Sequence, residues 1–485
     1  MTSDSATTAR DLFLSKDLTE AGAEAYLAAR GFADPKAADE HLQALAQDLP
    51  TRLALGEVAD VLIDALTNSA DPDGALVGVT RYLVTRTPIS GFLGYLKDDP
   101  RAAEILAALF GASPSLGEVL IRNPEFFHWL QLSLKRPAPD LIDLRNGLQQ
   151  VLSSNLRTDA RIEAIKRFRR REYLGIAARD LLGVSDIPTA TAQLSLLADV
   201  VIDGVLKLLS TDLASTESLL AMPGRFAVIA MGKLGGLELN YSSDIDLIYV
   251  YEPDDPSVPA HHELFHKLAR RLTKTLGDHT DESYLYRVDL RLRPMGRHGD
   301  VTCTLKQYSH YYDSMGETFE RFALIKARPV AGDTELGADF MDLVRPFVYR
   351  RYLDHAAFEE IARYKRRAEQ AGDGDRDVKV GRGGIREIEL FTQILQVTYG
   401  AEHEAVRSPT TLRALAALLE QDILDADVHR QLDEAYRFLR MVEHRLQIVH
   451  QSQTHTLDAD GEMLDLSARR MGSVSYTHLT LPTKA

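Results

Sequence analysis

Length, composition and charge already exclude several classes of protein. The chain has 485 residues, 45% hydrophobic and 26% charged, which suits roughly two to four folded domains and not a disordered chain. A formal net charge of −15, with basic residues scattered among acids, argues against nucleic acid as a partner. Cys303 is the only cysteine, so no intrachain disulfide forms and the composition fits a reducing compartment. No segment has the length and apolarity of a signal peptide or membrane span, so we expect a cytoplasmic protein without membrane contact.

The first part of the chain is predicted to be helical. Apolar residues recur at three- and four-residue spacing in 102–110, 116–121 and 194–209. Prolines punctuate this region between the periodic runs, where a helix can end without losing internal hydrogen bonds: Pro114, Pro124, Pro137 and Pro188. We therefore predict an N-terminal helical region over residues 1–219.

The pattern changes after Pro223. Residues 226–230 form a short apolar run that enters a glycine-rich loop, and 245–251 are rich in β-forming residues. A helical stretch at 262–276 separates them from 286–292, where apolar and polar residues alternate strictly as in a strand. This order predicts a small α/β unit over residues 220–330.

Helical periodicity returns after Pro329, and we predict a third, helical domain over 331–473. Its expected helices are 358–370, 387–398, 412–419 and 428–451, interrupted by the glycine-rich 380–384, with an exposed Asp/Gly loop at 372–377. Residues 474–485 break the pattern without turn or capping residues, and we interpret them as a non-native tail. The expected fold class is α+β, mainly helical.

Two aspartates at the start of the second predicted strand are the strongest chemical signal. Asp244 and Asp246 are two residues apart, so their side chains leave the same face of a strand. Two unpaired carboxylates repel each other unless cations compensate, and two Mg²⁺ ions about 4 Å apart are a known solution. Upstream, the glycines of 232–236 would let backbone N–H groups approach phosphate oxygens, and Lys233 would add a point charge.

The third acid of the expected site is Asp289. It shares one face of the predicted strand with Arg287, Arg291 and Arg293. On an isolated strand, this set is most simply a ladder of ion pairs. Downstream of a glycine loop and an Asp-x-Asp strand, we interpret Asp289 as a third metal ligand.

These motifs resemble a known fold and family. A glycine loop, an acidic pair and a third acid on a neighbouring strand are similar to the nucleotidyltransferase fold of the DNA polymerase β superfamily. The segment GKLGGLELNYSSDIDL at 232–247 resembles the diagnostic motif of glutamine synthetase adenylyltransferase/adenylyl-removing enzymes. Further similar segments follow in order, so that the resemblance covers about residues 90–470: 287–294, 379–389, 443–447 and 453–455.

That family carries two related nucleotidyltransferase halves in one longer chain, and only one copy of the motif is present here. Residues 110–114 resemble the N-terminal half, which implies the adenylyl-removing half, cut off before the transferase half. The implied reaction is phosphorolysis. Inorganic phosphate removes AMP from an adenylylated tyrosine of glutamine synthetase and ADP is released. Adenylyl transfer from ATP to glutamine synthetase is the alternative direction.

The resemblance also implies roles for single residues. Asp244, Asp246 and Asp289 would be catalytic and would hold Mg²⁺ or Mn²⁺. The nucleotide phosphates are assigned to Gly232, Lys233, Gly235, Gly236 and Ser243, and the attacking phosphate to Arg291 and Arg293. Glu387 and Glu389 either face the site or simply occupy the favourable start of a helix. Glutamine synthetase, ATP or ADP, phosphate and a PII-type nitrogen signal protein are the expected partners.

Other interpretations remain open on the sequence alone. His262, Glu263 and His266 match the zinc-protease pattern, which is short and arises by chance; an exposed helix surface is the ordinary explanation. His444, His450 and His455 are more typical of surface and packing histidines than of a metal cluster. Residues 308–312 are a packed or substrate-facing aromatic patch rather than a cofactor site. A non-catalytic fragment that only binds glutamine synthetase or a signal protein is an alternative from another class.

Overall fold

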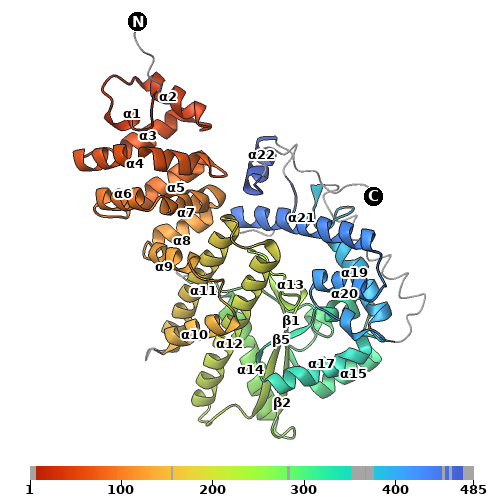
Figure 1. The fold of residues 1–485 in the computed structure, drawn as a ribbon. Helices are drawn as coiled ribbons and strands as arrows, with labels where there is room; N and C mark the ends of the chain where they lie inside the picture. Colours follow the sequence, from red (N-terminus) through yellow and green to blue (C-terminus); the bar gives the residue numbers. More distant parts are fainter. Residues whose placement is uncertain are drawn as a thin grey trace.

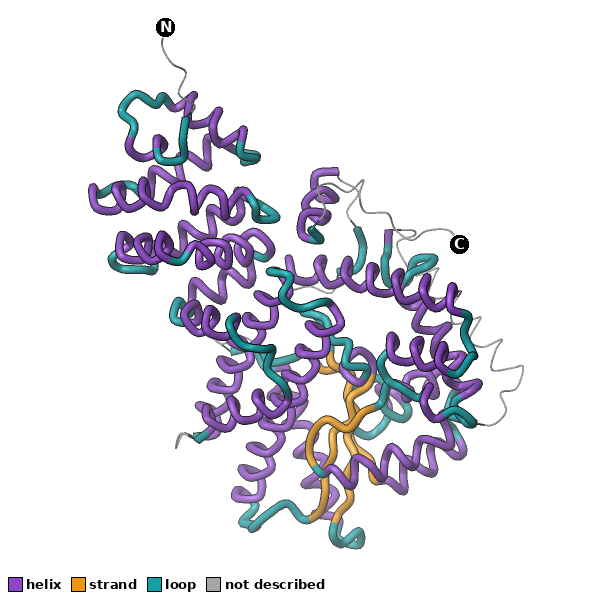
Figure 2. The backbone as a smooth tube through the Cα atoms, in the orientation of Figure 1, coloured by secondary structure: helices purple, strands orange, loops and turns teal. Residues whose placement is uncertain are grey.

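A computed structural model describes residues 7–153, 157–280, 284–350, 366, 376–450, 454–457 and 461–472. Its N-terminal helices form an arm that projects from the body of the molecule, and the two longest of them run down into that body (Figures 1 and 2). These helices are α1 (Asp11–Leu14), α2 (Glu20–Ala29), α3 (Pro35–Leu45), α4 (Leu49–Thr67), α5 (Pro72–Val84), α6 (Ile89–Asp98), α7 (Pro100–Ala112), α8 (Pro114–Arg122), α9 (Phe126–Leu134), α10 (Leu141–Leu152), α11 (Thr158–Leu181) and α12 (Ile187–Thr216). The helices expected around 102–110, 116–121 and 194–209 correspond to α7, α8 and α12.

Several of these helices begin at a capping residue followed by proline. The Ser113 hydroxyl accepts a hydrogen bond from the backbone of Leu116, and Pro114 occupies the first turn of α8. Asp186 caps α12 in the same way, ahead of Pro188. A proline in the first turn loses no hydrogen bond, because that N–H has no helical partner. Pro114 and Pro188 thus lie in the first turns of α8 and α12, between the periodic runs and just after the preceding helix has ended, as expected.

A small mixed sheet forms the centre of the body. Its strands are β1 (Gly224–Met231), β2 (Ile245–Pro253), β3 (Val288–Asp289), β4 (Thr302–Thr304) and β5 (Arg328–Gly332), in the order β3-β2-β1-β5, with β4 also paired to β2. β1 is antiparallel to β2 and β5, whereas β3 and β4 run parallel to β2. The two long strands β1 and β2 and the helix that follows β2 were predicted from sequence, and the fold class is confirmed as α+β and mainly helical.

Helices cover both faces of this sheet. Phe226, Val228 and Ala230 of β1 pack into the core shared with α11, α12 and α14 (Pro259–Gly277). The alternate residues Ala227 and Ile229 pack into a second core with α15 (Leu305–Ser314), α16 (Thr318–Ile325) and α17 (Thr334–Val348). Two covered faces explain why both long strands read as continuous apolar runs.

The alternation of β2 decides where the acidic side chains point. Ile248 and Val250 belong to the core on the α15–α17 face, whereas Leu247 and Tyr249 belong to the opposite core. Because side chains two residues apart share a face, Asp246 points to the α15–α17 side of the sheet.

The C-terminal helices pack around a third core that includes Ile388, Leu418 and Leu439. They are α19 (Ile385–Tyr399), η3 (Glu404–Val406), α20 (Thr411–Glu420), α21 (Ala426–His450) and α22 (Gly461–Arg470). Helix α21 passes above the sheet from the C-terminal helices toward the arm, and contacts α8, α12, α19 and α20 (Figure 1). The helix expected at 358–370, apart from residue 366, and the tail at 474–485 lie outside the described residues, as does most of the 372–377 loop.

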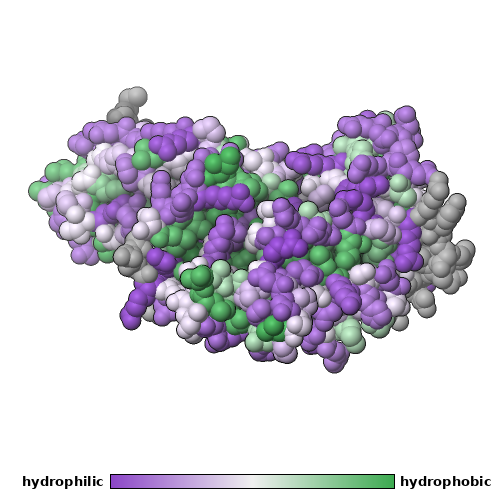
Figure 3. Space-filling model, turned by 90° about the horizontal axis from the view of Figure 1, so that it is seen from below, coloured by the Kyte–Doolittle hydropathy of each residue, from purple (hydrophilic) through white to green (hydrophobic). Residues whose placement is uncertain are grey.

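The surface mixes polar and apolar residues. On the face in Figure 3, hydrophobic side chains form separate patches among hydrophilic ones. None of the helices in the described part of the chain combines the length and apolar character needed to cross a bilayer.

Candidate active site

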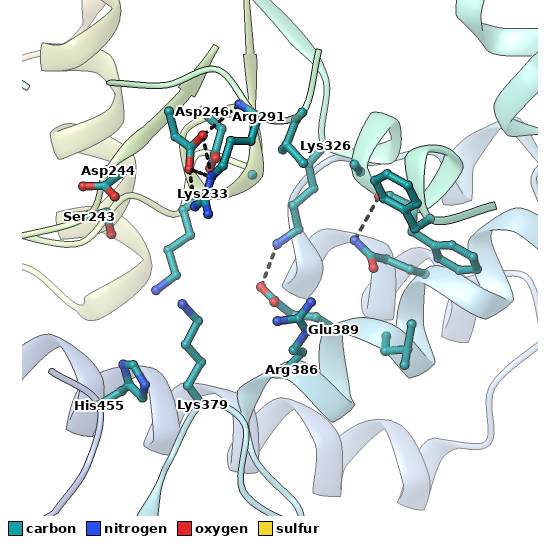
Figure 4. A pocket seen from close by; sticks show the side chains of 18 of the residues that line it. Lys233, Ser243, Asp244, Asp246, Arg291, Lys326, Lys379, Arg386, Glu389 and His455 are labelled. Carbon is teal, nitrogen blue, oxygen red and sulfur yellow. Dashed lines mark hydrogen bonds and ion pairs between the residues drawn. The ribbon is translucent and has the colours of Figure 1, made fainter. Parts of the chain in front are cut away.

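A cavity of about 770 Å³ opens beside the end of β2, between the sheet and the helices α16, α19 and α21 (Figure 4). Its lining combines acidic, basic and apolar side chains. The acids are Asp244, Asp246, Asp289, Glu317 and Glu389; the bases are Lys233, Arg291, Lys326, Lys379, Arg386 and His455; and the remaining residues are Gly232, Ser243, Leu292, Thr318, Phe319, Phe322, Ala323, Leu390, Gln393 and Gln447. Such a lining suits a ligand with one apolar part and one charged part.

Two of the predicted acids are neighbours across the sheet. Asp246 of β2 is in register with Asp289 of the parallel strand β3, so their side chains leave the same face. Burial, together with the charges of Asp289 and Asp244, raises the pKa of Asp246 to about 6. No described residue donates a hydrogen bond to its carboxylate. A carboxylate in this situation is stabilised by a cation.

Arginines hold the other two acids. Arg287 Nε donates to Asp244 Oδ1 at 2.6 Å, and Arg291 Nε donates to Asp289 Oδ2 at 2.7 Å. Although burial opposes it, the bonds to Arg291 lower the pKa of Asp289. In Figure 4, Asp244 lies to one side of Asp246. The described residues contain no group of three acidic, histidine or cysteine side chains arranged as metal ligands. All three predicted acids line the cavity, with Asp246 and Asp289 in register, and their role as metal ligands stays a prediction.

The strand carrying Asp289 is much shorter than its alternating sequence predicted. It consists of Val288 and Asp289 alone. The Asp289 carboxylate accepts the backbone N–H of Arg291 at 2.8 Å, and this local turn competes with the ladder of a continuing strand. Arg293 donates to backbone carbonyls, including Leu290 O at 2.7 Å and Asp300 O at 3.0 Å. Arg293 does not line the cavity, so nothing in this geometry supports its predicted contact with the attacking phosphate.

The glycine-rich segment after β1 is a single helical turn, α13 (Gly232–Gly235), instead of a loop. Gly232 has φ +54°, and a Cβ there would lie 2.4 Å from Asp246 Oδ2. At Gly235, a Cβ would lie 1.8 Å from the Lys326 carbonyl oxygen, and Gly236 accepts a hydrogen bond from Thr410. Gly232 and Lys233 line the cavity, whereas Gly235 and Gly236 do not, so packing explains those two glycines.

Replacing Gly232 by alanine should destabilise the fold and disturb Asp246. The left-handed backbone costs a Cβ-bearing residue about 1–2 kcal/mol, and the clash with Asp246 adds to this. We expect a lower free energy of unfolding by about 1–3 kcal/mol, measured by denaturant titration. Gly94→Ala is the matched control, because that Cβ meets nothing within 4 Å on helix α6 and should be neutral or stabilising. Equal stability of both variants would contradict the packing argument.

Lys233 reaches the cavity but already has a partner. Its Nζ donates to Glu443 Oε1 on α21, a residue 210 positions further along the chain. Burial lowers the pKa of Lys233 to about 8, although Glu443 opposes the shift. Burial alone would raise the pKa of Glu443, but Lys233 and Arg440 bring it to about 2. Ser243 also lines the cavity, directly before Asp244.

A buried charge cluster fixes the opposite wall. Lys326 Nζ donates to Glu238 Oε2 and to Glu389 Oε1, each at 2.7 Å. The side chains of Lys326 and Glu238 are 8% and 6% exposed. Glu389 thus faces the site as an ion-pair partner, whereas Glu387 is not among the lining residues. Sequence reasoning missed Lys326, since nothing local marks a lysine whose partners are 88 and 63 residues away.

The second glycine-rich segment contributes two further bases to the lining, Lys379 and Arg386. The family resemblance had drawn attention to this segment but assigned them no role. Glycine and basic residues in one short motif were the only sequence signal.

The competing sites do not form. His262 bonds the Tyr251 hydroxyl at 2.7 Å and Glu263 pairs with Arg270 on the surface of α14. His444 is fully buried against Tyr241, with ring centroids 4.2 Å apart. The first and last tyrosines of 308–312 are buried in the sheet core. No metal-ligand group occurs in any of these places within the described residues.

Comparison with known proteins identifies the family to which the chain is similar. Residues 103–343 match the family model of glutamate-ammonia ligase adenylyltransferase, and residues 353–479 match that of GlnD PII-uridylyltransferase. A bifunctional glutamine synthetase adenylyltransferase/adenylyl-removing enzyme of Hahella chejuensis is 34% identical over 79% of this chain. Proteins of the same name are 34% identical over 91% of the chain in Streptomyces avermitilis and 37% over 75% in Nitrosococcus oceani.

The chain belongs to the glutamine synthetase adenylyltransferase family. The matches cover 40%, 43% and 39% of the length of these three relatives. The chain therefore spans about two fifths of the family members it matches. Residues 232–247, which resemble the family motif, contain the turn α13 and the start of β2 with Asp246. The turn α13 contacts β2.

Proposed function

We propose that this chain is the adenylyl-removing half of a bifunctional enzyme and that it removes AMP from an adenylylated tyrosine of glutamine synthetase. Inorganic phosphate would be the attacking group and ADP the product. The supporting observation is the registered pair Asp246 and Asp289 at the edge of a cavity that also contains basic and apolar side chains. The names of the relatives supply the substrate protein.

We propose Mg²⁺ or Mn²⁺ as the cofactor, held by Asp246 and Asp289. Asp246 fits this role because its carboxylate accepts no hydrogen bond from the described residues and faces other acids. Carboxylate oxygens are the ligands that these hard cations prefer. When bound, such a cation neutralises charge on the transferring phosphoryl group. Asp244 would join the pair only after Arg287 releases it.

The remaining lining residues would bind and orient the substrates. Gly232 lets the backbone approach phosphate oxygens closely, and Ser243, which also lines the cavity, carries a hydroxyl that can donate to them. Phe319 and Phe322 from α16 form an apolar wall suited to a nucleoside base. Arg291 positions Asp289 through paired hydrogen bonds. Phosphoryl-type transfer depends mainly on such positioning and charge neutralisation.

The reaction can be tested directly. Incubation with adenylylated glutamine synthetase, phosphate and Mg²⁺ should release ADP, measured by chromatography, and chelation of the metal should stop it. Pyrophosphate formation from ATP and unmodified glutamine synthetase would instead indicate adenylyl transfer. Binding of glutamine synthetase without either product would indicate a non-catalytic fragment.

A PII-type signal protein is the proposed regulator. Support comes from the match of residues 353–479 to a PII-uridylyltransferase model. Adding such a protein to the ADP-release assay should change the rate, and an unchanged rate would argue against this partner.

A further inference from the structure

The second glycine-rich segment is a tightly braced turn beside the cavity. The buried Asp377 carboxylate accepts the backbone N–H groups of Lys379 and Val380, each at 2.9 Å. Val378 donates to the carbonyl of His455, and Arg386 donates to the carbonyl of Lys379. At Gly384, a Cβ would lie 2.8 to 3.0 Å from three carbonyl oxygens of this turn. The backbone of Lys379 is therefore held in place without any ligand.

The side chain of Lys379 extends from this turn into the cavity. Figure 4 shows its amine pointing toward that of Lys233, across from the end of the sheet that carries Asp246. Burial is the main cause of the lowered pKa of Lys233, and the charge of Lys379 adds to it; the same charge partly opposes the rise in the pKa of Asp246 that burial causes. No described residue forms a hydrogen bond or ion pair with its ammonium group.

The other bases of the lining are engaged. Lys233 pairs with Glu443, Lys326 with Glu238 and Glu389, and Arg291 with Asp289. His455 Nε2 lies 3.4 Å from Asp377 Oδ2. The Arg386 side chain also makes an interaction with another residue. Lys379 thus adds a positive charge near Lys233 that no described residue pairs with directly, and an anion between the two amines would relieve their repulsion.

We propose that Lys379 binds the terminal phosphate of the reaction, which is free inorganic phosphate before the transfer and the β-phosphate of ADP after it. This inference rests on the proposed function and adds the residue that recognises the attacking group. Lys379 takes the role that the sequence analysis gave to Arg293, whose guanidinium group donates to backbone carbonyls. An ammonium group is a point charge with three donors, and suits a tetrahedral oxyanion that enters and leaves.

The chemical step balances with Lys379 as a binding group alone. An oxygen of hydrogen phosphate attacks the α-phosphorus of the tyrosyl-AMP ester. The new bond forms the diphosphate of ADP, and the bond from phosphorus to the phenolic oxygen breaks. The proton of hydrogen phosphate passes to the phenolic oxygen, so the tyrosine leaves neutral and ADP carries the charge of both reactants. Lys379 takes no part in this proton transfer.

Equilibrium binding of AMP and ADP with Mg²⁺, measured by calorimetry, tests this proposal without glutamine synthetase. We expect the chain to bind ADP more tightly than AMP, and inorganic phosphate to compete with ADP while leaving AMP binding intact. In Lys379→Gln, the preference for ADP should fall about 10- to 100-fold, as expected for loss of a charge-assisted contact. Lys379→Arg should retain part of the preference. Arg382→Gln is the matched control, since it removes a charge from an exposed position of the same turn and should leave the preference unchanged.

The outcomes separate the two proposals. Equal binding of AMP and ADP by the unmodified chain would overturn the phosphate site but leave a nucleotide site. An unchanged preference for ADP in Lys379→Gln would overturn the role of Lys379. Absence of binding by both nucleotides would overturn the proposed function and this inference with it.

Discussion

Asp246→Asn should reduce the release of ADP from adenylylated glutamine synthetase by about 100- to 1000-fold, because one full charge of the proposed metal site is lost. Asparagine keeps the volume of the side chain, so the cavity keeps its shape. Burial and the neighbouring acids raise the pKa of Asp246 to about 6, which means that its ionised form destabilises the folded state at neutral pH. The thermal midpoint of the variant should therefore be unchanged or higher.

The control for this experiment is Asp254→Asn. Asp254 is exposed just beyond the far end of β2 and does not line the cavity, so the same chemical change there should leave the rate unchanged. Full activity of Asp246→Asn would contradict the proposed metal site. A lowered thermal midpoint would instead show that Asp246 supports the fold.

Local patterns predicted the elements that carry the site. The apolar runs of β1 and β2 and the helical spacing of α14 are short-range signals, and each element formed within a few residues of its expected bounds. The placement of Asp289 on a strand next to that of Asp246 was predicted from the resemblance to the nucleotidyltransferase fold. Neither segment alone specifies which strands become neighbours.

The partners of the site residues could not be predicted in this way. Glu443 lies 210 positions from Lys233, and it reaches the cavity only because α21 passes over the sheet. Strand β3 is short because the Asp289 carboxylate accepts a hydrogen bond from the backbone N–H of Arg291, which competes with a continuing strand. The alternation of residue types does not reveal this hydrogen bond. Contacts made by tertiary packing decided which basic side chains of the described cavity lining are engaged, and hence why Lys379 is left for a ligand.

The prediction with the largest expected effect on stability concerns Lys326. Lys326→Met should lower the free energy of unfolding at pH 7 by about 3–5 kcal/mol, the usual cost of removing one partner from a buried ion pair. The variant leaves Glu238 and Glu389 buried without their shared cation, although Thr411 still donates to Glu238 at 2.9 Å. Denaturant titration would measure the loss.

A surface pair provides the matched control for Lys326. Lys267 pairs with Glu217 at 2.6 Å, but their side chains are 44% and 37% exposed. Lys267→Met removes the same kind of contact where water replaces it, so the loss should stay below about 1 kcal/mol. Comparable losses in both variants would show that burial does not govern the energetics of the Lys326 cluster.

The pH dependence of the Lys326 variant identifies the cause of its instability. Burial alone would raise the pKa of Glu389, but Lys326 brings it to about 2, below the ordinary value of 4.5. In the unmodified chain Glu389 therefore stabilises the fold above pH 4.5, and this contribution is lost as the pH falls toward 2. Without Lys326, only Arg440 and Lys233 oppose the effect of burial, so the folded carboxyl of Glu389 takes up a proton more readily than it does in the unmodified chain. The difference in the free energy of unfolding between the unmodified chain and Lys326→Met should thus be widest at neutral pH and should narrow as the pH falls through 4.5.

Lys326→Met/Glu389→Gln should recover part of the loss at pH 7, because the double variant no longer buries that charge. A gap independent of pH, with no recovery in the double variant, would assign the instability to lost packing instead of an unpaired carboxylate.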